Sequence, residues 1–209
     1  MARDLESIVA AMTSMDSTFS AHKPLGRFRV GLVNVSCDPV IEQGIREEMN
    51  RRGWAWEVVT LPLLDQAFEA AFAVINAETV AAYGQYTGQA LLGTDIEARL
   101  LRAAHTDAVA VQAAQAVRIA FSEQVDHLLE RFDTLVLPSL PRLPPLLVDV
   151  CKGESVIDLT RFLRPFNLSG HPALSMPIPY PGSSIKTSLQ LIGAKGEDAR
   201  MCAIAGAFL

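Results

Sequence analysis

Two spacings of apolar residues divide the first third of the chain into strands and helices. Apolar positions alternate from Phe28 to Val35, which predicts a strand, and a second strand is predicted from Trp54 to Thr60. Between them, Asp38 followed by Pro39 predicts a helix with an aspartate N-cap, and Gly53 predicts its end. A strand–helix–strand unit of this kind predicts that the two strands pair in parallel.

Apolar residues at helical spacing predict further helices. Residues 3–12 carry one apolar stripe and are expected to be helical, followed by a surface connection over 13–26. Asp65 is expected to cap a helix whose shared face is formed by Phe68, Ala71, Phe72, Ile75 and Thr79. Residues 95–131 are expected to be helical in two pieces that break near 105–107. A coiled-coil dimer is one interpretation of this stretch, but no heptad is sustained, so a helix buried within the chain is favoured.

The C-terminal third alternates short apolar runs with proline and glycine. Asp133 to Leu137 predicts a strand with Asp133 as its end cap, and Pro138 to Pro145 predicts an extended loop. Residues 146–160 show few strong elements, which suits a cleft-lining loop and equally a merely irregular one. The remaining elements are a turn at Pro181 to Ser184, a strand from Ile185 to Ile192 and a helix from Glu197 to Phe208. Together they predict an α/β fold, a mixed β-sheet flanked by helices, in one domain.

Composition narrows the class of protein. The chain has 209 residues, 50% of them apolar, which is enough for one globular core. Its net charge of -5 and the lack of a Lys/Arg run argue against nucleic acid and against electrostatic membrane attachment. We find no signal peptide and no membrane span in the sequence. Three widely spaced cysteines without a CxxC pair predict neither a disulfide framework nor a zinc site, and fit a cytoplasmic location.

The stretch from Phe166 to Pro179 is a turn punctuated by glycine and proline that leads into a short strand. Asn167 is suited to local hydrogen bonds with the backbone, Gly170 to a positive φ, and Pro172 to a rigid start of the strand. Such a turn holds backbone groups in fixed positions. Two interpretations remain open on the pattern alone: a wall of a ligand cleft, or a plain structural corner.

The order of several motifs resembles the C-terminal half of the amidase signature family, serine hydrolases that cleave carboxamide bonds. The residues from Phe166 to Pro177, the strand from Ser188 to Gly193 and the final helix match the family pattern. Phe132 to Pro138 and Arg29 to Leu32 match two of its strands, and Met1 to Glu6 matches the start of an internal helix. The resemblance covers essentially the whole chain and implies the fold of that family.

The catalytic half of the family pattern is missing from these 209 residues. In the family, a Lys and a Gly/Ser-rich loop of the type GGSSGGSAA precede the helix that Met1 to Glu6 resembles, and they supply a cis-serine, the nucleophilic serine and oxyanion-hole amides. Ser183 and Ser184 lack the flanking glycines and are expected in a hairpin turn. We therefore expect residues 1–209 to be a partial amidase signature domain that contains no catalytic residue and is inactive alone.

The resemblance implies that this half forms a wall of the substrate cleft. Asn167, Gly170 and Pro172 are the candidates that would shape it, and Gln190 is a weaker one because a glutamine in a strand often only satisfies neighbouring backbone. In the amidotransferase subunits of the family an acidic residue precedes the Asn by about seven positions. Thr160 stands there, with Asp158 nearby, which favours a general amidase lineage over a transamidation subunit.

The dispersed histidines predict no Ser-His-Asp triad and no metal site. His171 is expected to form hydrogen bonds in its turn, and Glu123, Asp126 and Glu130 are expected on a solvated helix face. No cofactor is expected. The expected partners are a small-molecule amide when the catalytic half is present, and a second copy or a complementing catalytic half. The alternatives are a binding module without turnover and a truncated remnant.

Overall fold

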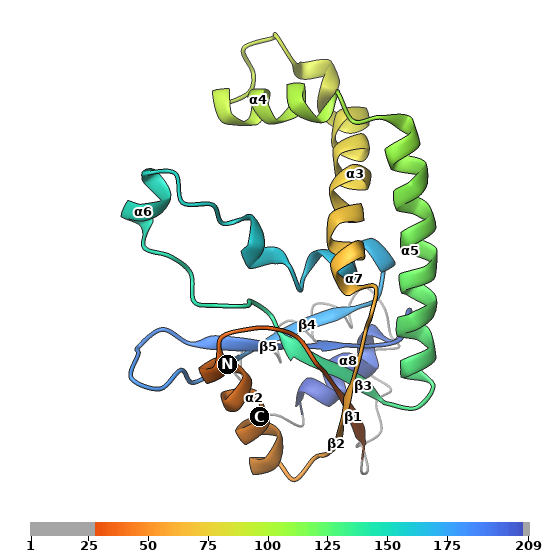
Figure 1. The fold of residues 1–209 in the computed structure, drawn as a ribbon, viewed down its shortest axis with the longest axis vertical. Helices are drawn as coiled ribbons and strands as arrows, with labels where there is room; N and C mark the ends of the chain where they lie inside the picture. Colours follow the sequence, from red (N-terminus) through yellow and green to blue (C-terminus); the bar gives the residue numbers. More distant parts are fainter. Residues whose placement is uncertain (1–27, 207–209) are drawn as a thin grey trace.

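The computed structural model describes residues 28–206, which form one mixed sheet with helices on both faces (Figure 1). The strands lie in the order β2-β1-β3-β5-β4. Their bounds are Arg29–Val33 for β1, Ala55–Val59 for β2, Thr134–Pro138 for β3, Ala173–Ile178 for β4 and Thr187–Ile192 for β5. β1 pairs in parallel with β2 and β3, whereas β5 is antiparallel to β3 and β4. The predicted α/β class with a mixed sheet is confirmed.

The first strand–helix–strand unit forms as the sequence predicts. Helix α2 spans Pro39–Arg51, and the Asp38 side chain accepts a hydrogen bond from the Val40 N–H at 2.8 Å. Gly53 follows the helix with a φ of 66°, a conformation that costs glycine little. The buried stripe Ile41, Ile45 and Met49 packs on the sheet, so the helix connects two parallel strands.

Alternate positions of β3 divide the core into two clusters. Leu135 and Leu137 pack with helices α3 (Leu64–Tyr83), α5 (Ala108–Leu129) and α7 (Arg164–Ser169) on one face. Val136 packs on the other face with α2 and α8 (Asp198–Gly206). Because side chains of a strand point alternately to opposite faces, a strand that is buried throughout, such as β3, lies between two layers of helices.

Helix α3 differs from the sequence prediction at its start and on its buried face. Asp65 is not the N-cap, because the helix begins at Leu64 and Leu63 occupies the cap position without a side-chain hydrogen bond. Instead, Asp65 accepts a hydrogen bond from Arg161 at 3.1 Å. The buried residues are Leu64, Ala67, Phe68, Ala71 and Val74, whereas Ile75 is 41% exposed. Packing against both α5 and α7 rotates the buried stripe away from the predicted one.

The long helical stretch breaks where predicted. Helix α4 spans Thr94–Ala103, and α5 begins after the Asp107 side chain accepts from the Val109 N–H at 3.0 Å. Between α3 and α4 lies a short 3-10 helix, η2, at Gly84–Tyr86. Phe121 and Val125 of α5 are fully buried within the chain, as favoured over a coiled coil.

Residues 146–160 contain more regular structure than expected. Helix α6 spans Leu147–Cys151 and a second 3-10 helix, η3, spans Ile157–Thr160. Figure 1 shows α6 standing apart from the sheet. Arg142 donates to Asp158 from Nε at 3.1 Å and from a terminal nitrogen at 3.2 Å, so a two-point ion pair closes the base of this segment, which we call the arm (residues 143–157).

Three expectations concern residues outside the described range: the helix at 3–12, the connection at 13–26 and the end of the last helix at Phe208. Within the described part, α8 starts at Asp198 rather than Glu197 and buries Met201, Ile204 and Ala205. None of the helices described is long and apolar enough to cross a lipid bilayer.

Candidate functional site

The residues from Phe166 to Ser169 are helical rather than part of a turn. They form the end of α7, which Gly170 terminates in the left-handed conformation with a φ of 76°. The Gly170 N–H donates to the Phe166 carbonyl oxygen at 2.9 Å, which closes the helix. The predicted positive φ at Gly170 is therefore confirmed, whereas the turn itself begins only at this residue.

Residues 170–172, which we call the corner, join α7 to β4, and Pro172 connects the corner to the sheet. Its carbonyl oxygen accepts from the Gly193 N–H at 3.0 Å, immediately after β4 and β5 pair through Ala173 and Ile192. A Cβ built on Gly193 would lie 2.4 Å from Met201 of α8, so only glycine fits between the strand end and that helix. The corner is thus fixed on both sides: by α7 before it and by β5 after it.

Gln190 lies on β5, between β3 and the edge strand β4, and is fully buried. Its Nε2 donates to the Phe162 carbonyl oxygen at 2.6 Å and to the Pro138 carbonyl oxygen at 3.4 Å. Among the described residues its Oε1 has no hydrogen-bond partner. Gln190 therefore joins the end of β3 to the segment that precedes α7, and these backbone groups lie 52 and 28 residues away rather than on neighbouring positions.

The four predicted site residues do not gather around one described cavity. Asn167 is exposed on α7 and lines a cavity of about 140 Å³ between α3, α5 and α7. Gly170 and Pro172 follow it at the corner, where β4 begins beside the end of β5. Gln190 lies two residues before the end of β5 and points to the face that carries Leu137 and Ser175.

A series of hydrogen bonds that the sequence did not predict ties the corner to α5. The Ser169 Oγ lies 2.8 Å from His171 Nδ1, and His171 Nε2 lies 2.9 Å from Asp126 Oδ1. A carboxylate opposite Nε2 requires a proton on that nitrogen, so in the neutral ring Nδ1 accepts from the serine hydroxyl. The expected role of His171 as a hydrogen-bonding corner residue is confirmed, but Asp126 is not simply on a solvated face.

The pKa shifts of the two ionisable groups have separate causes. Burial lowers the pKa of His171 below its usual value, against the opposing effect of the Asp126 carboxylate. Burial opposes the ionisation of Asp126, but hydrogen bonds from His171 and Lys195 outweigh it and hold the pKa of the carboxyl below its usual range. Lys195 lies 3.2 Å from Asp126 Oδ2 and also contacts the Ser122 hydroxyl.

Ser169, His171 and Asp126 have the residue types of a catalytic triad, but a substrate cannot reach the serine hydroxyl. Ser169 is only 5% exposed, and its hydroxyl also lies 3.3 Å from the carbonyl oxygen of Phe166. A substrate carbonyl cannot reach a hydroxyl enclosed in this way, since attack requires contact at about 3 Å. We conclude that Ser169, His171 and Asp126 hold α5 and the corner together. No signal in the sequence links residues 45 positions apart, so sequence reasoning did not find them.

Thr160 and Asp158 lie beside the arm. The Thr160 hydroxyl donates to the Ile157 carbonyl oxygen at 2.9 Å, which stabilises η3. The Asp158 carboxylate is engaged by Arg142, and Glu154 lies 3.5 Å from the same guanidinium. The acid nearest to Thr160 is thus already neutralised by a positive charge of this chain.

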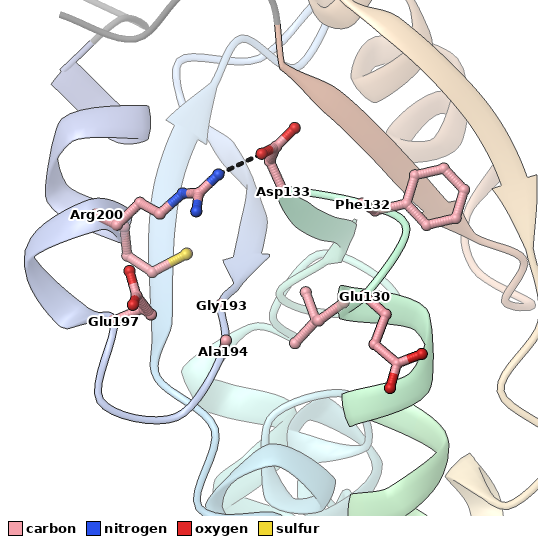
Figure 2. A pocket seen from close by; sticks show the side chains of 9 residues that line it. Glu130, Phe132, Asp133, Gly193, Ala194, Glu197 and Arg200 are labelled. Atoms are coloured by element: carbon pink, nitrogen blue, oxygen red, sulfur yellow. Dashed lines mark hydrogen bonds and ion pairs between the residues drawn. The ribbon is translucent and has the colours of Figure 1, made fainter. Parts of the chain in front are cut away.

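A second cavity, of about 200 Å³, lies at the amino-terminal end of β3 (Figure 2). Asp133 accepts from the Arg29 N–H at 2.7 Å and pairs with Arg200 of α8, which confirms its predicted role as a strand-end cap. Figure 2 shows Glu130 extending away from this pair, so the acids of the cavity do not converge. Among residues 28–206, no three His, Cys, Asp or Glu side chains are placed to hold a metal ion.

Comparison with known proteins identifies the family. The family model described as Amidase matches residues 5–202. A glutamyl-tRNA(Gln) amidotransferase subunit from Geobacillus kaustophilus is 24% identical over 251 residues, an alignment that covers 96% of this chain and 50% of the relative. Fatty acid amide hydrolase from Medicago truncatula is 31% identical over 103 residues, covering 46% of this chain and 17% of the relative.

Solved structures share the fold. The allophanate hydrolase of Kluyveromyces lactis superposes with a TM-score of 0.74 at 18% identity, over 88% of this chain and 33% of that one. In each of these comparisons the chain spans half or less of the relative's length. The matched family model covers residues 5–202, which is nearly all of the sequence. The chain belongs to the Amidase family.

Proposed function

We propose that this chain forms one wall of the substrate cleft of a carboxamide hydrolase. In that reaction a nucleophilic serine attacks the amide carbonyl, the C–N bond breaks, and water then releases the acid. None of the 209 residues forms the Gly/Ser-rich stretch that supplies the nucleophile in the family. The nucleophile, its proton carrier and the oxyanion donors come from a polypeptide segment outside these residues, whether joined to them or separate.

The observation that carries the proposal is the position of Gln190. One buried carboxamide holds the end of β3 at Pro138 and the segment before α7 at Phe162. The family resemblance implies that Pro138 to Pro145 and Val148 to Arg164 border the cleft, and the two carbonyl groups belong to these segments. A fixed wall serves catalysis because a displacement of about 1 Å in a bound substrate costs about a hundredfold in rate.

Each of the four candidate residues has its own part in the proposal. Asn167 is exposed and makes no side-chain hydrogen bond with another described residue, so its carboxamide is available to a substrate amide. Gly170 and Pro172 set the direction of the corner through the helix end and the first residue pair of β4. Gln190 acts through backbone, as a positioning residue.

Hydrolysis is the proposed activity rather than transfer of ammonia to a tRNA. Several relatives are amidotransferase subunits. The family resemblance implies an acidic residue at the position of Thr160 in such subunits, and this chain lacks it. The neighbouring Asp158 is neutralised by Arg142 and does not substitute for it. The arm instead presents Leu146, Leu147 and Val148, which are 53–78% exposed and suit an apolar substituent on the amide.

Two measurements test this function. The purified 209-residue chain should show no hydrolysis of benzamide or hexanamide. Turnover by the chain alone that disappears in Ser169→Ala or Ser122→Ala would contradict the proposal, because the nucleophile would then lie within these 209 residues.

The coding sequence next to that of this chain should contain a GGSSGGS-type stretch. If that stretch is encoded as a separate polypeptide, it should copurify with this chain. Joined or separate, the two parts together should hydrolyse amides, and Asn167→Ala should raise KM.

A further inference from the structure

The cavity between α3, α5 and α7 has an apolar floor and a charged rim. Ala71, Val74 and Leu168 are each less than 10% exposed and form the floor. Ile75 and Glu78 of α3, Arg118 of α5, and Arg164 and Asn167 of α7 complete the lining. The volume of about 140 Å³ is close to that of an apolar protein cavity, about 150 Å³, that accepts benzene. A six-membered ring therefore fits.

The rim has four polar side chains, those of Glu78, Arg118, Arg164 and Asn167, whose hydrogen-bonding groups are not used by other described residues. None of the four makes a side-chain hydrogen bond or an ion pair with another residue in the range 28–206. This contrasts with Arg46, Arg51, Arg131 and Arg142, which each pair with a carboxylate. A guanidinium offers five N–H donors in a planar fork that matches the two oxygens of a carboxylate. The rim thus holds unused donors.

The Arg164 guanidinium is fixed in place before any ligand binds. Its central carbon lies 3.9 Å from the centre of the Phe72 ring and 5.6 Å from that of Phe68. Stacking of this kind uses the face of the guanidinium and leaves its N–H edge available. Burial, and then repulsion from Arg99, lowers the pKa of Arg164 against an opposing attraction from Glu69, so an added negative charge at this place would be favourable.

The charges of the cavity favour an anion. One carboxylate and two guanidinium groups leave its lining with an excess of one positive charge, although the chain carries -5 overall. Asn167 adds an amide N–H₂ that donates to an oxygen. We propose that this cavity binds a small organic monocarboxylate with an apolar body, such as an aryl carboxylate. The ring packs on the floor, and the carboxylate accepts from Arg118, Arg164 and Asn167.

This inference does not depend on amide hydrolysis by the chain, and its test uses no turnover. Calorimetric titration of the 209-residue chain with benzoate should show saturable binding. Benzamide has the same ring without the charge and should bind about tenfold more weakly, because it loses the charge-assisted hydrogen bonds. Inorganic phosphate has the charge without the ring and should also bind weakly.

Variants locate the site. Arg118→Gln should weaken benzoate binding about tenfold, whereas Arg131→Gln, which removes the same charge just beyond the far end of α5, should leave it unchanged. Glu78→Gln should tighten binding several-fold, since it removes a negative charge from the rim. A tighter-binding variant cannot be explained by misfolding. The proposal is overturned if benzoate does not saturate, if benzamide or phosphate binds equally well, or if Arg118→Gln and Arg131→Gln behave alike.

Discussion

The buried His171 ring lies 2.9 Å from the half-exposed Asp126 carboxylate, across 45 residues of sequence. This contact joins α5 to the corner between α7 and β4, and Ser169 extends it into the last turn of α7. The corner that the family resemblance assigns to the cleft is therefore held by a titratable side chain, and its stability depends on pH.

We expect the free energy of unfolding to fall as the pH drops below about 6.5. The pKa of His171 is depressed in the folded state relative to about 6.5 in an unfolded chain. Between these two pKa values the unfolded chain binds more protons, so acid favours unfolding. Asp126 also has a depressed pKa, but its contribution is lost at lower pH, below about 3.9. Urea denaturation at several pH values measures both ranges.

Two histidine variants separate this effect from other titrations. His171→Gln should flatten the slope of stability against pH just below about 6.5. His127→Gln should not, because His127 is 74% exposed and its one ion pair with a residue of the range 28–206 is to Glu130, at the C-cap of the same helix. Equal slopes in the two variants would show that His171 is not the group responsible.

Gly170→Ala should destabilise the chain by about 1–2 kcal/mol, the cost of placing a residue with a Cβ in the left-handed region. A Cβ at position 170 would meet no neighbouring atom within 4 Å, so a steric clash does not contribute. The φ of 76° is therefore the cause of the destabilisation. Gly84→Ala is the matched control, because Gly84 follows α3 with an ordinary φ of -54°. Thermal unfolding should show a clear loss for the first and little change for the second; similar losses would contradict the role given to Gly170.

Gln190→Glu should cost about 3 kcal/mol or more near neutral pH, since a buried carboxylate would replace the N–H₂ that donates to Phe162 and Pro138. Burial raises the pKa of such a carboxyl, so this variant should regain stability as the pH is lowered towards about 4. Gln112→Glu on the exposed surface of α5 provides the same change of charge and should be nearly neutral. A mild, pH-independent effect at position 190 would mean that the amide does not hold these segments.

Arg142→Gln should release the arm without unfolding the sheet. The two-point pair with Asp158 would be lost, and exposed pairs of this kind contribute about 1 kcal/mol or less to global stability. Hydrogen exchange should therefore speed up several-fold over residues 143–157 alone. Lys152→Gln, within the arm, removes only a long contact of 3.8 Å to Asp149 and should leave exchange unchanged.

Local sequence patterns were sufficient to predict most of the helices and strands. The Asp38 cap, the Gly53 end, the break before Asp107 and the strands around the hairpin follow from periodicity and from residues with strong turn or cap preferences. The fold class followed because a helix between two strands predicts parallel pairing. The errors at Asp65 and at the buried face of α3 arose where several helices pack together, and local propensity does not decide such contacts.

The sequence alone determined the α/β class, the ordered motifs of the Amidase family and the place of the corner, because these depend on neighbouring residues. Only the tertiary structure decided what the side chains of that corner contact. His171 meets Asp126, Gln190 meets the backbone at Phe162, and Arg118 meets the same cavity as Arg164 across 45, 28 and 46 residues of sequence. Contacts over such separations are set by how the helices pack on the sheet, which no local pattern encodes.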